Sequence, residues 1–303
     1  MIEIRRKDNN SVLRTVNGDS LAGVDFREDC LANADLKGRD LSGALLQGAD
    51  LSGCDLREAT LRGALLQGAD FSHADLEGVD LQSANLAGAH FNKANLNGAD
   101  LNAAKLGDAN PGGAAVMAGC SLRGARMTAC DMRRVDLHGA DLRDADLCRA
   151  DLSDAYLAGA NLSNAYLGSA VLLGADLRSA DLNHAYLCNA RLNGAVLAGA
   201  NLDAAQMGGD NCIPVTLTLA NLSDASLVGT KLRGAIIRDA VLRNTNLTDA
   251  DLSECLMDGS MLRHCNVSGA NFANVDLFYT TCTFTNFSEA RNAVVPEWKR
   301  NVR

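Results

Sequence analysis

A large apolar residue, usually Leu, recurs every five residues along most of the chain. The series begins at Leu21 and runs to Leu106. It resumes one residue out of step at Met117 and continues to Phe287. A small residue, most often Ala, lies two positions before each large one, usually with Asp or Asn between them, as in Ala49-Asp50-Leu51. Self-similarity at a fixed period indicates a repeat architecture.

A period of five residues fits neither a continuous helix nor a continuous strand. A helix would spread the large residues around its axis, and a long strand would place alternate ones on opposite faces. A short side that ends at a corner keeps the phase, because each side then buries one large and one small residue. The octapeptide at Gly43 recurs unchanged at Gly63, twenty residues later. This spacing predicts a square coil of four sides per turn.

The Ala-(Asp/Asn)-Leu-x-x motif resembles the signature of the pentapeptide-repeat family. The resemblance extends from Asp19 to about Glu289 and implies an all-β fold, a right-handed quadrilateral β-helix. The repeat predicts one continuous solenoid of about 13 coils, each rising about 4.8 Å, the spacing of neighbouring strands. Because each coil buries its core only against its neighbours, both ends need caps.

Three parts are expected along the chain. Residues 1–18 lack the repeat, and two short apolar segments flank the turn-forming Asp8-Asn9-Asn10, which predicts a capping hairpin. Residues 19–289 are expected to form the β-helix. Residues 290–303, which include Trp298, are expected to fold over the last coil.

Two breaks interrupt the repeat. The one-residue slip at 110–113 predicts a bulged corner or a small loop. Residues 208–216 keep the count of five but lose the motif, which predicts a protruding loop. Removing residues 209–213 is therefore expected to leave the downstream phase intact. Outward residues are assigned to the four sides by the twenty-residue period. The assignment counts one extra residue at the first break and none at the second.

The composition and the cysteines favour a reduced cytoplasmic protein without catalytic activity. Hydrophobic residues make up 47% of the chain and aromatic residues only 4%, as a narrow Leu and Ala core requires. No segment resembles a signal peptide or a membrane span, and no CxxC occurs among the ten cysteines. Five cysteines occupy the inward small-residue position: Cys54, Cys120, Cys130, Cys255 and Cys265. We expect no cofactor, no phosphate loop and no metal site, even where His73 and His90 approach each other.

The outward positions hold the candidate interaction residues. On the most acidic side, carboxylates form a column near the N-terminal end, consisting of Asp35, Asp55, Glu58, Asp75 and Glu77. Stacked apolar residues form the second kind of surface: Leu45 with Leu65, and Tyr166 with Tyr186 further along the same assigned side. Tyr156 is assigned to the acidic side, followed by Val196, Ile236, Leu256 and Phe278. A column of exposed apolar residues is typical of a contact patch.

Two non-enzymatic functions remain open. The resemblance implies a relation to family members that imitate duplex DNA and protect DNA gyrase and topoisomerase IV from inhibitors. The net charge of −9 is compatible with electrostatic steering toward a basic protein groove. The alternative is an interaction scaffold for an unrelated cytosolic protein. Neither function requires direct binding of nucleic acid or of a membrane, and a homodimer through an end or an apolar side stays open.

Overall fold

The computed structural model describes residues 1–107 and 114–297. The chain divides into two compact units, Met1–Tyr156 and Leu157–Arg303, and each is described by itself. Within the described residues the fold is all-β and no α-helix occurs. No helix in these two described stretches is long and apolar enough to cross a membrane.

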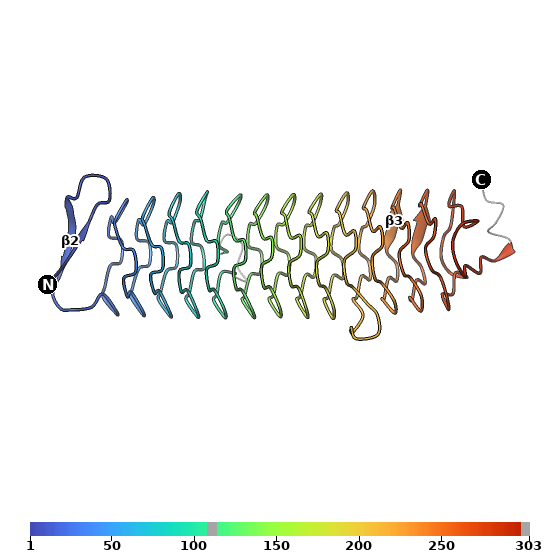
Figure 1. Ribbon diagram of the computed structural model, residues 1–303, viewed down its shortest axis with the longest axis horizontal. Helices are drawn as coiled ribbons and strands as arrows, with labels where there is room; N and C mark the ends of the chain where they lie inside the picture. The colour runs from blue at the N-terminus through green and yellow to red at the C-terminus, as the bar shows by residue number, and fades with distance from the viewer. Residues whose placement is uncertain (108–113, 298–303) are drawn as a thin grey trace. The chain divides into compact units, whose positions relative to one another are not determined.

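Both units are built from coils whose sides pair in parallel with the sides of neighbouring coils (Figure 1). In the N-terminal unit Asp35 pairs with Asp55, and Asp55 with Asp75, at intervals of twenty residues. The Leu56 amide donates to the Asp75 carbonyl at 2.7 Å, and the Asp55 amide donates to the Ala34 carbonyl at 3.0 Å. The predicted β-helix with four five-residue sides per turn is therefore confirmed.

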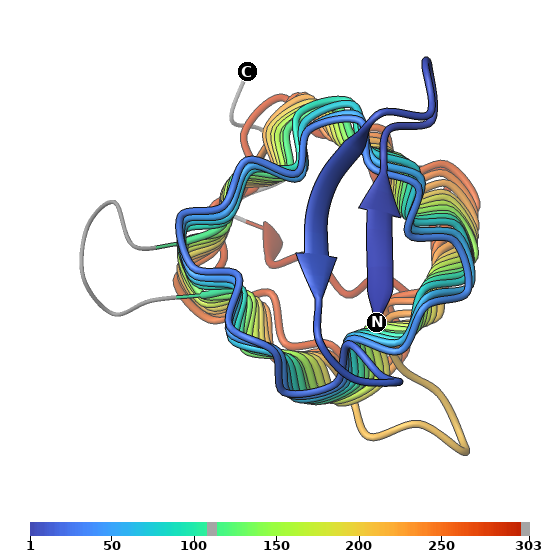
Figure 2. The same ribbon diagram turned by 90° about the vertical axis from the view of Figure 1, so that its left-hand side faces the viewer.

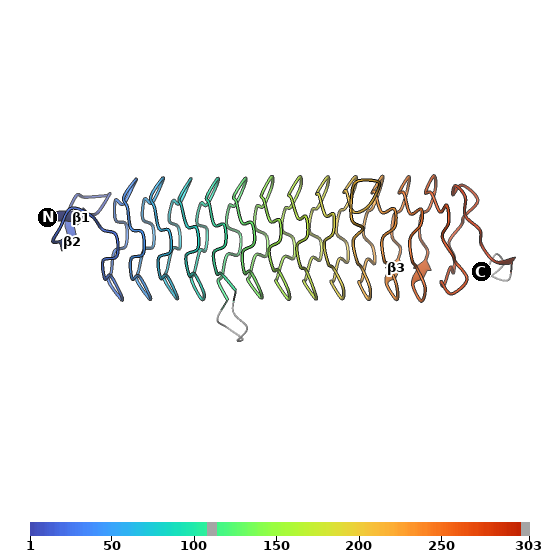
Figure 3. The same cartoon turned by 90° about the horizontal axis from the view of Figure 1, so that it is seen from below.

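Longer pairings occur at one place in the C-terminal unit. Strand β3 (Val241–Arg243), labelled in Figure 3, pairs in parallel with β4 (Met261–Arg263) on the neighbouring coil. In both strands the outer residues are exposed and the central Leu is buried. The inward and outward alternation of the repeat therefore continues through these strands.

The core of each unit consists of the inward large and small residues. Leu147 and Ala145, the inward pair of one pentapeptide, are both fully buried. Rings fit where they stack on neighbouring coils, as Phe71 and Phe91 do with centroids 4.9 Å apart. Small polar residues are accommodated when they bond a core carbonyl: the Thr230 hydroxyl donates to the Leu202 carbonyl at 2.8 Å. All five cysteines predicted to face inward are buried.

The corners explain why Asp and Asn precede so many of the large residues. The Asp50 carboxylate accepts the Ser52 amide at 3.0 Å, and this contact between residues two apart recurs along both units. It satisfies a turn N–H that the ladder leaves unpaired. The second corner residue lies in the left-handed region, with φ of 63° at Gly43 and 58° at Glu58. Glycine is frequent there because it adopts this conformation without a Cβ clash.

A hairpin covers the open end of the first coil (Figure 2). Strands β1 (Ile2–Arg5) and β2 (Val12–Val16) pair antiparallel. The Lys7 amide donates to the Asn33 carbonyl at 2.9 Å, so the hairpin continues the backbone pairing of the coil. Ile4 points into the core and is 2% exposed.

The C-terminal end carries a different set of contacts. Phe272 and Phe287 pack edge to face with centroids 5.4 Å apart. The Arg291 guanidinium donates to the Gly269 carbonyl at 2.8 Å, and Val295 is buried. Trp298, which was expected to contribute to the cap, lies outside the described residues.

The first break shifts the ladder by more than one residue. Lys105 pairs with Asp131 and His90 with Val116, 26 residues apart instead of twenty. The Ala115 amide closes the corner by donating to the Leu106 carbonyl at 2.8 Å. Six residues, rather than one, are therefore added between the flanking sides. The bulge predicted at 110–113 lies outside the described residues, and the one-residue assumption used to assign sides is wrong.

The second break adds one whole pentapeptide. Arg191 pairs with Thr216, 25 residues away. The Val215 amide donates to the Met207 carbonyl at 2.9 Å, which closes the ladder beneath residues 208–212, here called loop 208–212. The loop extends outward from its coil (Figure 1). Because five residues equal one side, the leucines after the loop keep their five-residue spacing. Each side nevertheless pairs with a different side of the next coil than the unbroken count predicts. Assigning sides by the unbroken count is therefore wrong after this loop.

The core assignment predicts unequal effects for two neighbouring side chains. Replacing Leu147 with Ala should lower the free energy of unfolding by about 2–5 kcal/mol, because it leaves a cavity in a fully buried column. Replacing Ala145 with Leu should cost about 1–3 kcal/mol by overpacking. The exposed Arg149 is the control, and Arg149→Ala should stay within about 0.5 kcal/mol of wild type in chemical denaturation. Equal midpoints for Ala145→Leu and wild type would contradict the inward placement.

Loop 208–212 predicts which deletion the coil tolerates. A regular corner in this unit has a left-handed second residue, such as Ala204 with φ of 54°. Deleting 210–214 leaves Gly208-Gly209 at the corner, and Gly adopts that conformation readily. Deleting 209–213 leaves Pro214 there, and the proline ring fixes φ near −65°.

Thermal or chemical denaturation of the two deletion variants checks this prediction. We expect the deletion of 210–214 to fold and the deletion of 209–213 to be less stable by more than about 1 kcal/mol. Each variant lacks five residues, so the comparison isolates the effect of the corner conformation. Equal stabilities would show that the chain rebuilds this corner differently.

Candidate interaction surfaces

The structure brings the five predicted acidic residues together in the N-terminal unit. Asp35, Asp55 and Asp75 form one parallel ladder on successive coils. The Glu58 amide donates to the Glu77 carbonyl at 3.0 Å, so these two exposed residues also lie on neighbouring coils. We call this set of five the acidic column. Beyond Asp75 the ladder continues through Asn95 and Ser121.

Part of this negative charge is already compensated. Arg57 forms ion pairs with Asp55 at 2.6 Å and with Asp75 at 3.6 Å. The hydrogen bond from the Arg57 guanidinium is the main reason why the pKa of Asp55 is lowered. The side chains of Asp35 and Asp75 also accept the amides of Lys37 and Glu77, both at 3.3 Å. These carboxylates therefore stabilise corners as well as contributing charge.

The two units differ in net charge. Residues 1–156 hold 24 Asp and Glu against 17 Lys and Arg, a net −7. Residues 157–303 hold 13 Asp and Glu against 11 Lys and Arg, a net −2. Most of the net negative charge therefore belongs to the N-terminal unit.

The predicted apolar pairs exist, but their assignment to sides was wrong. Leu45 pairs with Leu65, and both are half-buried. Their ladder continues from Lys105 to Asp131. The predicted side, which also held Tyr166 and Tyr186, required Lys105 to pair with Arg126 instead. The six added residues at the first break cause this difference. Tyr166 and Tyr186 pair with each other in the C-terminal unit and are 55% and 40% exposed.

The apolar column assigned to the acidic side does not form. Tyr156 is 53% exposed, but it pairs with Asp136 in the ladder of His90 and Val116 rather than with the acidic column. Val196 pairs with Asn221, and Ile236 pairs with Leu256 in another ladder. The pentapeptide added at loop 208–212 separates Val196 from Ile236.

His73 and His90, the two histidines considered for a metal site, lie in different surroundings. His90 occupies a ladder between Asp70 and Val116, while His73 lies at an exposed corner with φ of 60°. Within residues 1–107 and 114–297, no group of three or more His, Cys, Asp or Glu is placed to hold a metal ion.

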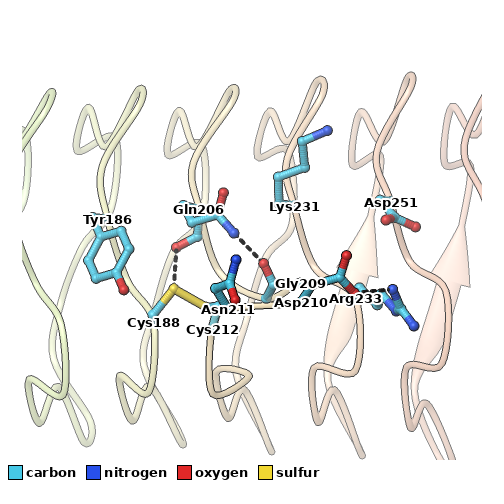
Figure 4. Close-up of a pocket in the computed structure, with 11 residues that line it drawn as sticks. Tyr186, Cys188, Gln206, Gly209, Asp210, Asn211, Cys212, Lys231, Arg233 and Asp251 are labelled. Carbon is cyan, nitrogen blue, oxygen red and sulfur yellow. Dashed lines mark hydrogen bonds and ion pairs between the residues drawn. A yellow bond between two sulfur atoms is a disulfide. The ribbon is translucent and has the colours of Figure 1, made fainter.

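A groove of about 620 Å³ lies beside loop 208–212 in the C-terminal unit (Figure 4). Its floor consists of outward side chains of one ladder, which pair in the order Tyr186, Gln206, Lys231 and Asp251. The loop forms its wall. The groove therefore offers an aromatic ring, an amide, an ammonium group and a carboxylate along one line of neighbouring coils.

A disulfide between Cys188 and Cys212 joins the loop to the coil, with Cα atoms 5.2 Å apart (Figure 4). The expectation that all cysteines are reduced is therefore wrong. The sequence suggested no pairing because 24 residues separate the two and neither lies in the inward small-residue position. Their proximity follows from the added pentapeptide, which lets the Asn189 amide donate to the Ile213 carbonyl at 2.6 Å.

Polar contacts also hold the loop. The Gln206 side-chain amide donates to the Gly208 carbonyl, and Arg233 forms ion pairs with Asp210 and with Glu254. Gly208 is required where the loop leaves the coil, because a Cβ there would lie 2.3 Å from the Arg233 carbonyl oxygen. The signal in the sequence was the loss of the motif after Met207, which marked the loop but not its partners.

Comparisons with known proteins agree with this architecture. A family model described as pentapeptide repeats matches most of the chain, at residues 20–57, 30–68, 44–82, 74–110, 114–147, 150–187, 180–209, 220–259 and 257–291. A search of curated proteins gives no match.

Three similar solved structures cover between 39% and 78% of the chain. HetL, a pentapeptide repeat protein involved in heterocyst differentiation regulation from the cyanobacterium Nostoc sp., is 31% identical, with a TM-score of 0.30; the match covers 78% of this chain and 89% of HetL. QnrB1, a plasmid-mediated fluoroquinolone resistance protein, is 13% identical, with a TM-score of 0.39, covering 73% of this chain and 90% of QnrB1. A pentapeptide repeat protein from the Arabidopsis thaliana thylakoid lumen is 30% identical, with a TM-score of 0.22; the match covers 39% of this chain and 68% of that protein.

Proposed function

Because the chain belongs to the pentapeptide repeat family, whose motif builds a scaffold rather than a catalytic site, we propose that it is a non-catalytic protein-binding module. Its contact surface is the pair Tyr166 and Tyr186 together with the adjoining groove. The observation that carries the proposal is the exposure of these two tyrosines, 55% and 40%, at paired positions on neighbouring coils. Tyrosine is enriched at protein interfaces and among the residues that dominate binding energy.

The surroundings of the tyrosine pair support this assignment. Tyr186 lines the groove together with Lys231 and the disulfide-bonded loop, so a partner meets an aromatic ring and an ammonium group beside a raised wall. The backbone ladder fixes the spacing of the two tyrosines along the chain's surface, which lowers the entropic cost of presenting them. We place this module in the cytoplasm, with a protein rather than a nucleic acid or a membrane as its partner.

A second candidate function is the protection of a type II topoisomerase such as DNA gyrase or topoisomerase IV. The acidic column in a unit of net charge −7 favours it. A basic groove that receives duplex DNA attracts an acidic surface over distances of about 10 Å at 0.1 M salt. The ion pairs of Arg57 with Asp55 and Asp75 reduce this attraction, so the candidate stands second.

The tyrosine surface is tested by a paired substitution. Tyr166→Ser/Tyr186→Ser should weaken binding of the specific partner about tenfold or more, since each truncated interface anchor costs about 1–2 kcal/mol. Affinity is measured with the partner purified after quantitative pull-down from the encoding organism. Val241→Ser/Met261→Ser is the matched control, because it removes another exposed apolar pair of the same unit. An equal loss of affinity in both variants would show that the tyrosine pair is not a specific part of the interface.

The second candidate is tested by DNA supercoiling with purified gyrase, with and without a quinolone, at two ionic strengths. The chain should inhibit the enzyme or rescue it from the drug, and the effect should fade as salt rises. Neutralising the acidic column, with Asn for Asp and Gln for Glu, should weaken the effect about tenfold, or 1.4 kcal/mol. Asn retains the side-chain oxygen that accepts the corner amide, so folding is preserved.

A control variant separates the position of the charges from their number. It neutralises five carboxylates on other ladders of the same unit: Asp80, Asp100, Asp131, Asp146 and Asp151. We expect it to retain most of the effect. The absence of any effect of the wild-type chain at micromolar concentration would exclude topoisomerase protection and leave the scaffold function.

A further inference from the structure

Seven of the ten cysteines fall into two chemical classes, and Cys30, Cys148 and Cys282 lie outside both. Five lie in the core, where burial raises the pKa of each thiol to about 12: Cys54, Cys120, Cys130, Cys255 and Cys265. Because the thiolate is the reactive form, these five are poor partners for redox chemistry at neutral pH. The disulfide, by contrast, lies at the wall of the groove beside Tyr186.

We propose that the Cys188–Cys212 pair is a thiol–disulfide exchange site that fixes loop 208–212 beside the groove and releases it on reduction. The chemical partner is a dithiol reductant or, in the reverse direction, its disulfide. This inference does not rest on the proposed binding function, because thiol chemistry and loop protection are measured without a partner.

Access favours attack at Cys212. Cys188 is only 5% exposed on the coil, whereas Cys212 is half-buried on the loop, and both line the groove. A reductant thiolate bonds to the Cys212 sulfur, the bond to Cys188 breaks, and Cys188 leaves as a thiolate that takes up a proton. The second thiol of the reductant then displaces Cys212, which is protonated in turn, and closes the reductant disulfide. Two electrons and two protons pass to the pair.

Reduction should release the loop without opening the ladder. Beneath the loop the Val215 amide bonds the Met207 carbonyl at 2.9 Å, and Arg191 pairs with Thr216. These contacts close the coil independently of the disulfide. The loop itself is held by the Gly208 contact with Gln206 and by the ion pair of Asp210 with Arg233, in which Asp210 is 80% exposed. Exposed ion pairs contribute little to stability, so the covalent bond is the main restraint.

The functional consequence is a groove wall that depends on the redox state of the compartment. Disulfides persist in oxidising compartments and are reduced by dithiol systems in the cytosol. With the bond formed, residues 209–211 stay beside Gln206 and Arg233. With the bond broken, the loop moves away and the groove is widened on the side of Cys188.

The experiment uses the full chain under native conditions. Differential alkylation with peptide mass spectrometry should label Cys30 and Cys148 in the untreated protein, and should also label Cys188 and Cys212 after dithiothreitol. Hydrogen exchange of residues 209–212 should accelerate at least fivefold on reduction, while the amides of Asn189 and Val215 keep their protection. Reoxidation with an oxidised dithiol should restore the slow exchange.

Two variants serve as controls. Cys188→Ser/Cys212→Ser should show the fast loop exchange without reductant and should not respond to it. Cys30→Ser/Cys148→Ser, which keeps the pair, should respond like wild type. If the serine pair fails to fold, the wild-type protein with and without reductant still decides the question.

Three results would overturn the proposal. One is complete alkylation of Cys188 and Cys212 even after treatment with the oxidised dithiol, which would show that no bond forms. Another is reduction that leaves exchange at 209–212 unchanged, which would show that the bond does not restrain the loop. The third is faster hydrogen exchange at the amides of Asn189 and Val215 as well as in the loop, which would show that the bond stabilises the coil itself.

Discussion

Each side of the coil must satisfy its backbone hydrogen bonds with the neighbouring coils, and this pairing determines the rest of the structure. Leu56 donates to Asp75 and Asp55 donates to Ala34, so this side is bonded to the coil before it and to the coil after it. Some corner amides have no partner in the ladder. Asp and Asn side chains accept hydrogen bonds from these amides, as Asp50 does from the Ser52 amide. One large and one small inward residue then fill the space that the paired backbone encloses.

The same pairing decides where the chain can be interrupted. The break after Leu106 and the break after Met207 both close with an amide that donates to the last inward carbonyl before the break, from Ala115 to Leu106 and from Val215 to Met207. At both places a glycine follows that inward residue. A Cβ at Gly107 would lie 2.4 Å from the Arg133 nitrogen, much as at Gly208 beside Arg233. Insertions therefore leave the ladder intact and change only which sides become neighbours.

Much of the fold could be predicted from the sequence because inward positions obey a strict local rule. Leu147 and Ala145 are buried as the five-residue period requires. Partners across a break could not be predicted, because the phase of the leucines is the same for one added residue as for six. The assignment of Tyr156 to the acidic side failed for this reason. The Cys188–Cys212 pair was missed because its proximity depends on the length of the second insertion.

The scaffold also determines which surface residues carry information about function. Asp at the position before the large residue is favoured by the corner amide it accepts, so acidity accumulates in any chain with this repeat. The charge of the acidic column therefore has a structural cause that is independent of a partner. No corner or ladder contact requires an aromatic ring at an outward position. The pairing of the exposed Tyr166 and Tyr186 is consequently more specific to function than any single carboxylate, and Tyr186 lines the groove beside loop 208–212.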